Sequence, residues 1–348
     1  MNRRRFLALA ATSTVVGGCA DTAPDTAPVV VDSAVARPRV TTSPRTPKPA
    51  VAKVRANELG QIPVLMHHRL VTGSGPVGSY DMTPAFFRQE LERLHRENYY
   101  PIRAIDLVLG ELGSVPAGKT PVVLTFDDST PGQVTFDSSG QVAPDCALGI
   151  LRSFHARHPD FPAVATFYIN KSPFGLNGSA ATRALVRLTE LGCEIGNHTW
   201  SHPNLGSLTT AQAEAEIGKL AALVSQATPR SPARTLALPL GVHPRDSRVL
   251  ARGGSGGTAY RNLGVMLVGA EPSHSPFHRA FDPMAVPRIR CSSHDRGDGD
   301  LELGYWLDRL AAQPELKYVA SGTAGRITAP RSLKPEIGPA FRGRATWY

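Results

Sequence analysis

Short apolar runs alternate with longer amphipathic segments over most of the chain from about residue 60 onward. The runs are four to seven residues long and rich in β-branched and aromatic residues, which predicts buried strands. The expected strands are residues 62–66, 121–126, 163–169, 193–196, 234–239, 263–268 and 316–320. Segments with apolar residues at helical spacing predict helices at residues 84–97, 145–155, 182–191, 209–226 and 301–312. Regular alternation of strand and helix is typical of an α/β fold.

Two adjacent carboxylates follow one of these strands directly. The segment TFDD at residues 125–128 ends the apolar run that begins at Pro121. Neighbouring side chains at a strand end point in different directions, so Asp127 and Asp128 can have separate roles. Such an edge is where barrels and open α/β sheets place their active sites, although an Asp pair after a strand also serves as an ordinary loop or helix cap.

Two histidines follow a second predicted strand. His198 and His202 are four residues apart, a spacing at which one helical turn brings both imidazoles to one ion. Spaced histidines are often surface residues, but the combination with Asp127 and Asp128 favours a metal site. Two imidazoles and one carboxylate leave coordination positions open for water and substrate, as in hydrolytic sites.

The combination of TFDD with H-[ST]-x-x-H resembles the NodB-type polysaccharide deacetylases, the fourth carbohydrate esterase family. The segment IPVLMHH at residues 62–68 is similar to the opening strand of the branch that acts on poly-N-acetylglucosamine. Weaker similarities lie in LPLG at 238–241 and VPRIR at 286–290. The resemblance covers about residues 60 to 322 and implies a distorted (β/α) barrel.

The resemblance also implies roles for individual residues. Asp127 would be the general base, and Asp128, His198 and His202 would bind a divalent metal, zinc first and cobalt or nickel as alternatives. Ser129 and Leu240 stand where the family's motifs have other residues and would contact or orient the substrate. Arg288 would hold the base, although a surface or structural ion pair is an alternative for it.

The resemblance leaves the catalytic acid unassigned. The predicted closing strand, residues 317–322, has no histidine where the family's last motif has one. The candidate substitutes are His68, His243 and His294, each of which could also be an ordinary surface or structural histidine. Two functions follow: a metal-dependent deacetylase of an envelope polysaccharide, or a weakened relative that binds glycan without turnover.

The N-terminus predicts export and lipid anchoring. Residues 1–19 combine a twin-arginine-like basic start, a short apolar run and a lipobox ending at Cys19, the expected lipidation site; a plain signal peptide is the alternative. Residues 20–56 are rich in Pro and Thr and predict a disordered tether. The deacetylase domain is expected at 57–325 and a tail at 326–348, on an extracytoplasmic, membrane-anchored monomer.

Charge and cysteines exclude other classes. The net charge of +9 is partly carried by the tether, and no basic-aromatic motif accompanies it, so nucleic acid is not an expected partner. No two cysteines lie at zinc-finger spacing. Besides Cys19 the chain has Cys146, Cys193 and Cys291, which allow at most one internal disulfide.

Overall fold

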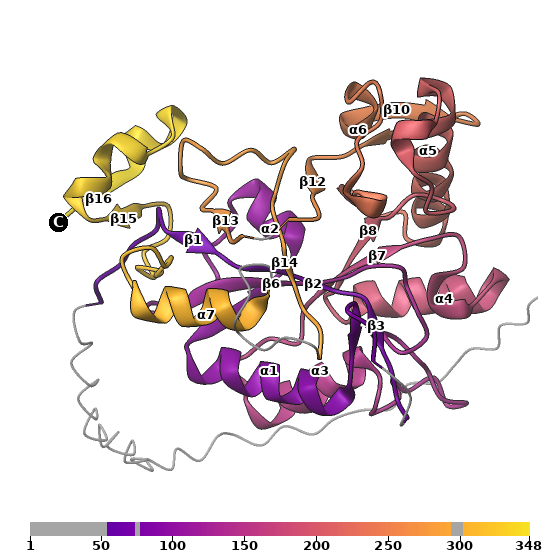
Figure 1. The fold of residues 1–348 in the computed structure, drawn as a ribbon, viewed down its shortest axis with the longest axis horizontal. Helices are drawn as coiled ribbons and strands as arrows, with labels where there is room; N and C mark the ends of the chain where they lie inside the picture. The colour runs from indigo at the N-terminus through magenta and orange to yellow at the C-terminus, as the bar shows by residue number, and fades with distance from the viewer. Residues whose placement is uncertain (1–53, 74–76, 270, 294–301) are drawn as a thin grey trace, which may run out of the picture. The chain divides into compact units, whose positions relative to one another are not determined.

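A curled sheet of eight parallel strands is the centre of the computed structural model, which describes residues 54–73, 77–269, 271–293 and 302–348 (Figure 1). The strands lie in the order β12-β9-β8-β7-β6-β2-β14, and β5 pairs with the first half of β6. Their bounds are β2 Val64–His67, β5 Tyr99–Ile102, β6 Thr120–Phe126, β7 Thr166–Ile169, β8 Glu194–Asn197, β9 Thr235–Ala237, β12 Gly264–Met266 and β14 Ile289–Arg290. All seven predicted strands except the last therefore lie in the sheet, with shifts of a few residues at their ends.

The two edges of this sheet approach each other across one short segment. Val286 bridges Met266 of β12 in parallel, and three residues later Ile289 pairs with Leu65 of β2. Residues 286–290 thus connect both edges, which confirms the expected distorted barrel. Because side chains alternate along an extended segment, this connection also carries Arg288 to the inside of the curl.

Helices connect successive strands, as a parallel sheet requires. They are α1 Pro84–Arg96, α2 Ala104–Leu109, α3 Ala147–Arg157, α4 Gly178–Glu190, α5 Thr210–Ala227, α6 Arg248–Ala251 and α7 Leu303–Ala312, with short 3-10 helices at Pro173–Gly175, Leu205–Ser207, Pro239–Gly241, Arg331–Glu336 and Pro339–Arg344. The five long helices confirm the five predicted ones within about four residues. Thr209 and Gln212 form the capping box at the start of α5. Within the described ranges, no helix has the length and apolar character needed to cross a membrane.

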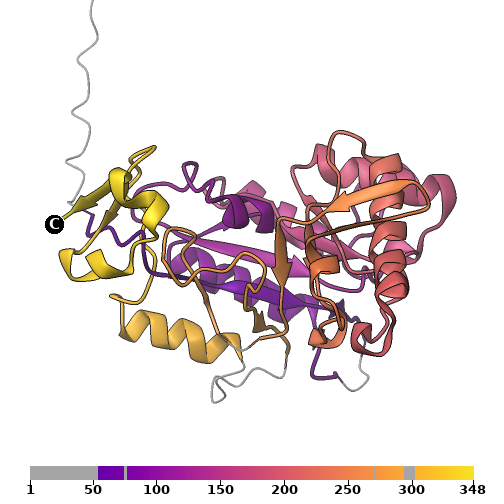
Figure 2. The same ribbon diagram turned by 90° about the horizontal axis from the view of Figure 1, so that it is seen from above.

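Four two-stranded pairings surround the sheet. They are β1 Gln61–Ile62 with β13 Ser273–His274, β3 Arg69–Leu70 with β4 Asp81–Met82, β10 Arg252–Ser255 with β11 Thr258–Arg261, and β15 Ile327–Ala329 with β16 Ala345–Trp347. The last pair belongs to residues 326–348, which pack on the domain: Ile327, Ala329 and Ile337 share a buried cluster with Leu59 and Tyr318. Figure 2 shows this yellow segment at the end of the molecule away from α5.

The strand expected at 316–320 is wrong. Among the described residues, this segment forms only isolated bridges, from Lys317 to Gln61 and from Val319 to Asn57. Its amide at Ala320 donates to the carbonyl of Lys119, just before β6 begins. Tyr318 and Ala320 are buried, so the apolar pattern reflects packing against the start of β6 rather than membership of the sheet. Residues 317–322 therefore lie at the opposite end of β6 from Asp127.

Candidate active site

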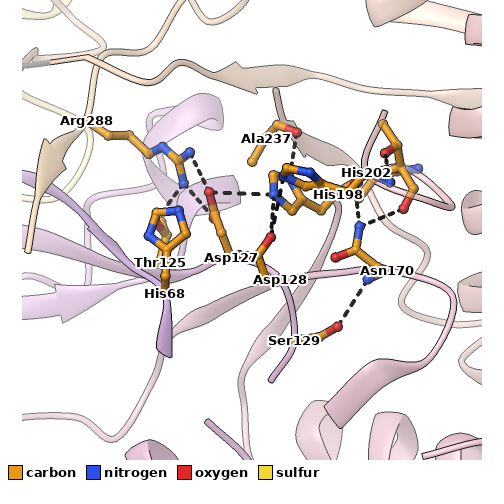
Figure 3. Close-up of polar contacts among 12 residues, drawn as sticks. His68, Thr125, Asp127, Asp128, Ser129, Asn170, His198, His202, Ala237 and Arg288 are labelled. Atoms are coloured by element: carbon orange, nitrogen blue, oxygen red, sulfur yellow. Dashed lines mark hydrogen bonds and ion pairs between the residues drawn. The ribbon is translucent and has the colours of Figure 1, made fainter. Parts of the chain in front are cut away.

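The two carboxylates diverge because the chain turns sharply where β6 ends. The amide of Asp127 still donates to the carbonyl of His67 on the neighbouring strand, at 2.9 Å. Asp128 and Ser129 then adopt left-handed backbone conformations, with φ of 71° and 47°. Non-glycine residues seldom adopt this conformation, and it is commonest where function requires it. The turn sends Asp127 inward and Asp128 toward the histidines (Figure 3).

Arg288 forms a bidentate ion pair with Asp127. Nη1 lies 2.7 Å from Oδ1 and Nη2 lies 2.7 Å from Oδ2. The remaining donors bind the carbonyl of Leu267 at 2.8 Å and the hydroxyl of Thr125 at 3.1 Å. Arg288 is fully buried, so these contacts exclude the surface ion pair left open by the sequence. Such a fork fixes the carboxylate plane more firmly than lysine would.

The surroundings keep Asp127 ionised. Burial alone would raise its pKa, but the charges of Arg288 and His198 outweigh burial and hold the pKa of Asp127 well below its ordinary value. Asp127 therefore enters any reaction as a carboxylate with a fixed orientation. That state is required of a group that accepts a proton.

Asp128, His198 and His202 converge on one point. Oδ1 of Asp128 lies 3.4 Å from Nε2 of His198 and 3.5 Å from Nε2 of His202. The three ligand atoms all lie within 4.8 Å of one another, as one bound ion requires. Burial alone would lower the pKa of His198, but the charges of Asp127 and Asp128 outweigh burial and raise this pKa above its ordinary value.

The residues fit a metal, as the surroundings of His198 show. Its Nδ1 lies 2.9 Å from the carbonyl of Ala237, so Nδ1 carries the proton and Nε2 presents a lone pair. This buried Nε2 has no hydrogen-bond partner among the described residues. A buried polar atom without a partner is rare in proteins, and a bound cation would satisfy this one.

A loop, rather than the expected helical turn, brings the two histidines together. Strand β8 ends at Asn197, and both Thr199 and His202 have left-handed backbones, with φ of 64° and 56°. The amide of His202 donates to the hydroxyl of Thr199. The spacing of four residues was therefore informative, but the helical turn predicted from it was wrong.

Ser129 stabilises this loop and does not line the cleft. Its buried hydroxyl accepts from the amide of Asn170 at 3.2 Å. The side-chain amide of Asn170 in turn donates to the carbonyls of His198, at 2.7 Å, and Thr199, at 3.0 Å. The sequence singled out Ser129 for substrate contact or orientation, whereas its hydroxyl contacts the backbone of Asn170 and not the cleft. Asn170 was missed, because its only sequence signal is its position just after strand β7.

The site opens into a cleft of about 530 Å³. Its lining combines the four polar site residues with one arginine and with aliphatic and aromatic side chains: His68, Arg69, Tyr80, Asp127, Asp128, His198, His202, Leu238, Leu240 and Val268. Among these lining residues, Leu240 is 60% exposed. Tyr80, which sequence reasoning did not select, also lines the cleft, and its ring lies edge-on to that of His68 with the centroids 4.7 Å apart.

Of the three candidate acids, only His68 is found at the site among the described residues. It follows β2 directly, lines the cleft, and lies beside the Asp127–Arg288 pair in Figure 3. Its buried Nδ1 has no hydrogen-bond partner within the described ranges. Burial lowers the pKa of His68, although Asp127 and Asp128 act in the opposite direction. His243 is exposed and does not line the cleft, and His294 lies outside the described residues.

Comparison with known proteins agrees with this site. Residues 114–254 match the model of the polysaccharide deacetylase family. The matched segment contains TFDD and both histidines, so the similarity covers the residues proposed as ligands. No curated protein matches the chain.

Solved structures share the fold at low sequence identity. The Streptococcus pyogenes deacetylase PplD in complex with acetate is 18% identical, with a TM-score of 0.51, and the match covers 68% of this chain and 94% of that one. The putative polysaccharide deacetylase BA0330 from Bacillus anthracis and the polysaccharide deacetylase BC0361 from Bacillus cereus are each 16% identical, with TM-scores of 0.50 and coverage of 73% of this chain and 69% of theirs. The similarity supports the barrel fold.

Proposed function

We propose that this protein is a metal-dependent hydrolase that removes acetyl groups from an N-acetylhexosamine polymer. The proposal rests on one observation: the two adjacent carboxylates have different partners. Asp128 faces two imidazoles, whereas Asp127 is held by Arg288 and stays available as a base. The matched family segment supports the same reaction class.

Asp128, His198 and His202 would hold the metal, and zinc suits this set of nitrogen and oxygen donors. A bound divalent cation would polarise the acetyl carbonyl and lower the pKa of water. Cobalt and nickel are alternatives with similar donor preferences.

Asp127 would accept the proton of the attacking water. Its Oδ2 lies 3.9 Å from Nε2 of His198, which places the carboxylate next to the metal position without making it a ligand. The low pKa of Asp127 keeps it ionised, and the bidentate grip of Arg288 prevents it from swinging into the ligand set. Water adds to the acyl carbon, the carbon–nitrogen bond breaks, and acetate leaves.

His68 would give the leaving nitrogen its proton. It lines the cleft beside Asp127, and its Nδ1, unpartnered among the described residues, is available for hydrogen bonding. A lowered pKa makes protonated His68 a stronger acid, which suits a poor leaving group such as an amine, although fewer molecules carry that proton at neutral pH.

The glycan-binding alternative rested on the absence of histidine from residues 317–322 and on the reduced motif at residues 238–241. The first of these segments packs beside the start of β6, away from the site, so the missing histidine does not argue against catalysis there. The apolar rim of Leu240 and Val268 suits the methyl group of an acetamide and the face of a neutral sugar.

The proposal extends to where the enzyme works. We propose export through the signal at residues 1–19, lipid anchoring at Cys19 and a tether over 20–56, all of which lie outside the described residues apart from the last three positions. An extracytoplasmic, membrane-anchored monomer would meet envelope or extracellular polysaccharide.

The role of His68 is tested by comparing leaving groups. His68→Gln should lower kcat on N-acetylglucosamine oligomers about 10²–10⁴-fold, because amide cleavage needs an acid. The same variant should hydrolyse an aryl acetate at nearly the wild-type rate, because a phenolate leaves without protonation. Equal losses on both substrates would show that His68 acts in binding or folding instead.

A further inference from the structure

A second group of metal-ligating side chains lies in the core, apart from the cleft. His67 ends β2, Glu90 lies in α1, and Cys291 follows β14. Their exposed fractions are 0%, 6% and 1%. One ligand atom from each lies within 4.8 Å of the other two. Three elements distant in sequence thus bring an imidazole, a carboxylate and a thiol together.

The His67 ring is fixed so that Nε2 faces Glu90. Nδ1 lies 3.1 Å from the carbonyl of Thr125 and therefore donates to it, while Nε2 lies 2.8 Å from Oε1 of Glu90. Phe126 stacks on the ring at 4.7 Å and Phe87 meets it edge-on at 5.5 Å. A pinned Nδ1–H is how proteins orient an imidazole that binds metal through Nε2.

Hydrogen bonding within the cluster does not satisfy Glu90. Its Oε2 is buried and has no hydrogen-bond partner among the described residues, and the side chain is only 3% exposed. A proton shared with His67 accounts for Oε1 alone. An unpartnered carboxylate oxygen in an apolar core is costly, and a bound cation would remove that cost by coordinating Oε2.

We propose that His67, Glu90 and Cys291 form a second, closed metal site that takes zinc. Nε2, Sγ and one oxygen of Glu90 supply three donor atoms of kinds that bind zinc, and the second oxygen of Glu90 can serve as the fourth. A thiolate in the set selects zinc over magnesium or calcium. Binding releases to solvent the thiol proton of Cys291 and any proton shared by His67 and Glu90, with no oxidation or reduction.

This site would be structural. It would tie β2 to α1 and to the segment after β14, and the carbonyl of His67 accepts the amide of Asp127 at 2.9 Å. The ion would therefore stabilise the strand end that carries the base, while taking no part in the reaction. The two sites also differ chemically, because no cysteine is among the described residues that line the cleft.

Cobalt distinguishes the two sites, because only the buried one offers sulfur. The full chain, carrying Cys19→Ser so that this thiol cannot contribute, would be freed of metal and titrated with Co²⁺. We expect about two ions per chain and a near-ultraviolet sulfur-to-cobalt charge-transfer band. Cys291→Ser should abolish the band and leave about one ion per chain, whereas His198→Ala should lose one ion and keep the band.

Cys146→Ser is the matched control, since Cys146 is also buried but caps α3 and is not one of the three clustered ligands. It should retain the band in full. A wild-type protein that binds cobalt without any sulfur band would overturn the proposal, as would a band that survives Cys291→Ser. If the cleft does not bind metal, the wild type would bind about one Co²⁺ ion per chain and would still show the sulfur band. That result would count against the deacetylase proposal and not against the second site.

Discussion

Replacing Arg288 with methionine would leave the Asp127 carboxylate buried without its partner. The guanidinium makes two bonds to Asp127 and one each to Leu267 and Thr125, and the side chain is fully buried. Methionine can fill much of the same volume but supplies no donor. The variant therefore isolates the effect of removing the charge and its hydrogen bonds.

We expect the free energy of unfolding to fall by about 3–5 kcal/mol at pH 8, the typical cost of breaking a buried ion pair by removing one partner. That is a large share of the roughly 5–15 kcal/mol that stabilises a typical domain. Adding Asp127→Asn should recover much of the loss, because it removes the uncompensated charge. Arg248→Met is the surface control: its pair with Asp246 is exposed, and its loss should change little.

The pH dependence provides a second signature. In the wild type the pKa of Asp127 is lowered, so its contribution to stability is present above the ordinary pKa and is lost as the pH falls below it. Without Arg288, less positive charge opposes the effect of burial on Asp127. The pKa of Asp127 in the folded state should therefore rise, and the folded protein should take up a proton at a higher pH than the wild type does. The variant should therefore regain stability as the pH falls from 8 to 5.

Urea unfolding of metal-free protein at pH 8 and pH 5 measures both effects. The slope of the free energy of unfolding against urea concentration should be the same in both proteins, so that a shift in the unfolding midpoint reports a change in stability. A loss below about 1 kcal/mol, or an equal loss at both pH values, would refute the account of this pair as a buried, charge-compensated unit.

Three further predictions concern the scaffold. Thr209→Ala removes the N-terminal cap of α5 and should lower the free energy of unfolding by about 0.5–2 kcal/mol in urea; no change would mean that the capping box is not formed. Gly196→Ala places a Cβ atom 2.3 Å from the Tyr168 ring and should cost about 1–3 kcal/mol, seen as a lower Tm, unless the ring can move aside. Burial raises the pKa of the Cys193 thiol to about 11, so iodoacetamide at pH 8 should label it only after unfolding; rapid labelling of folded protein would contradict its burial.

The local chemistry of the site was readable from the sequence, because it depends on residue types at strand ends. TFDD ends β6 and the first histidine follows β8, so the parallel sheet brings them to one edge. To predict that the carboxylates and the histidine lie close together, it was enough to place both strands correctly. Arg288 could be selected by resemblance, but its grip on Asp127 depends on how residues 286–290 close the barrel.

Other features depended on backbone geometry that periodicity does not encode. The loop joining His198 to His202 uses left-handed residues, although its spacing suggested a helix. The apolar pattern of 316–320 correctly indicated burial of Tyr318 and Ala320, but burial alone does not distinguish a sheet strand from a packed segment. The cysteine count allowed a disulfide, whereas Cys146, Cys193 and Cys291 are all buried thiols.

Acetate release is the most direct test of the central claim. The compact unit from Val51 to Tyr348, loaded with zinc, would be incubated with N-acetylglucosamine oligomers, peptidoglycan and acetylated xylan. The account predicts release from the N-acetylglucosamine oligomers that disappears in both Asp127→Asn and His198→Ala, with bound metal retained at the cleft in the first variant and lost in the second. Fully metal-loaded protein that releases no acetate from any of these polymers would contradict it.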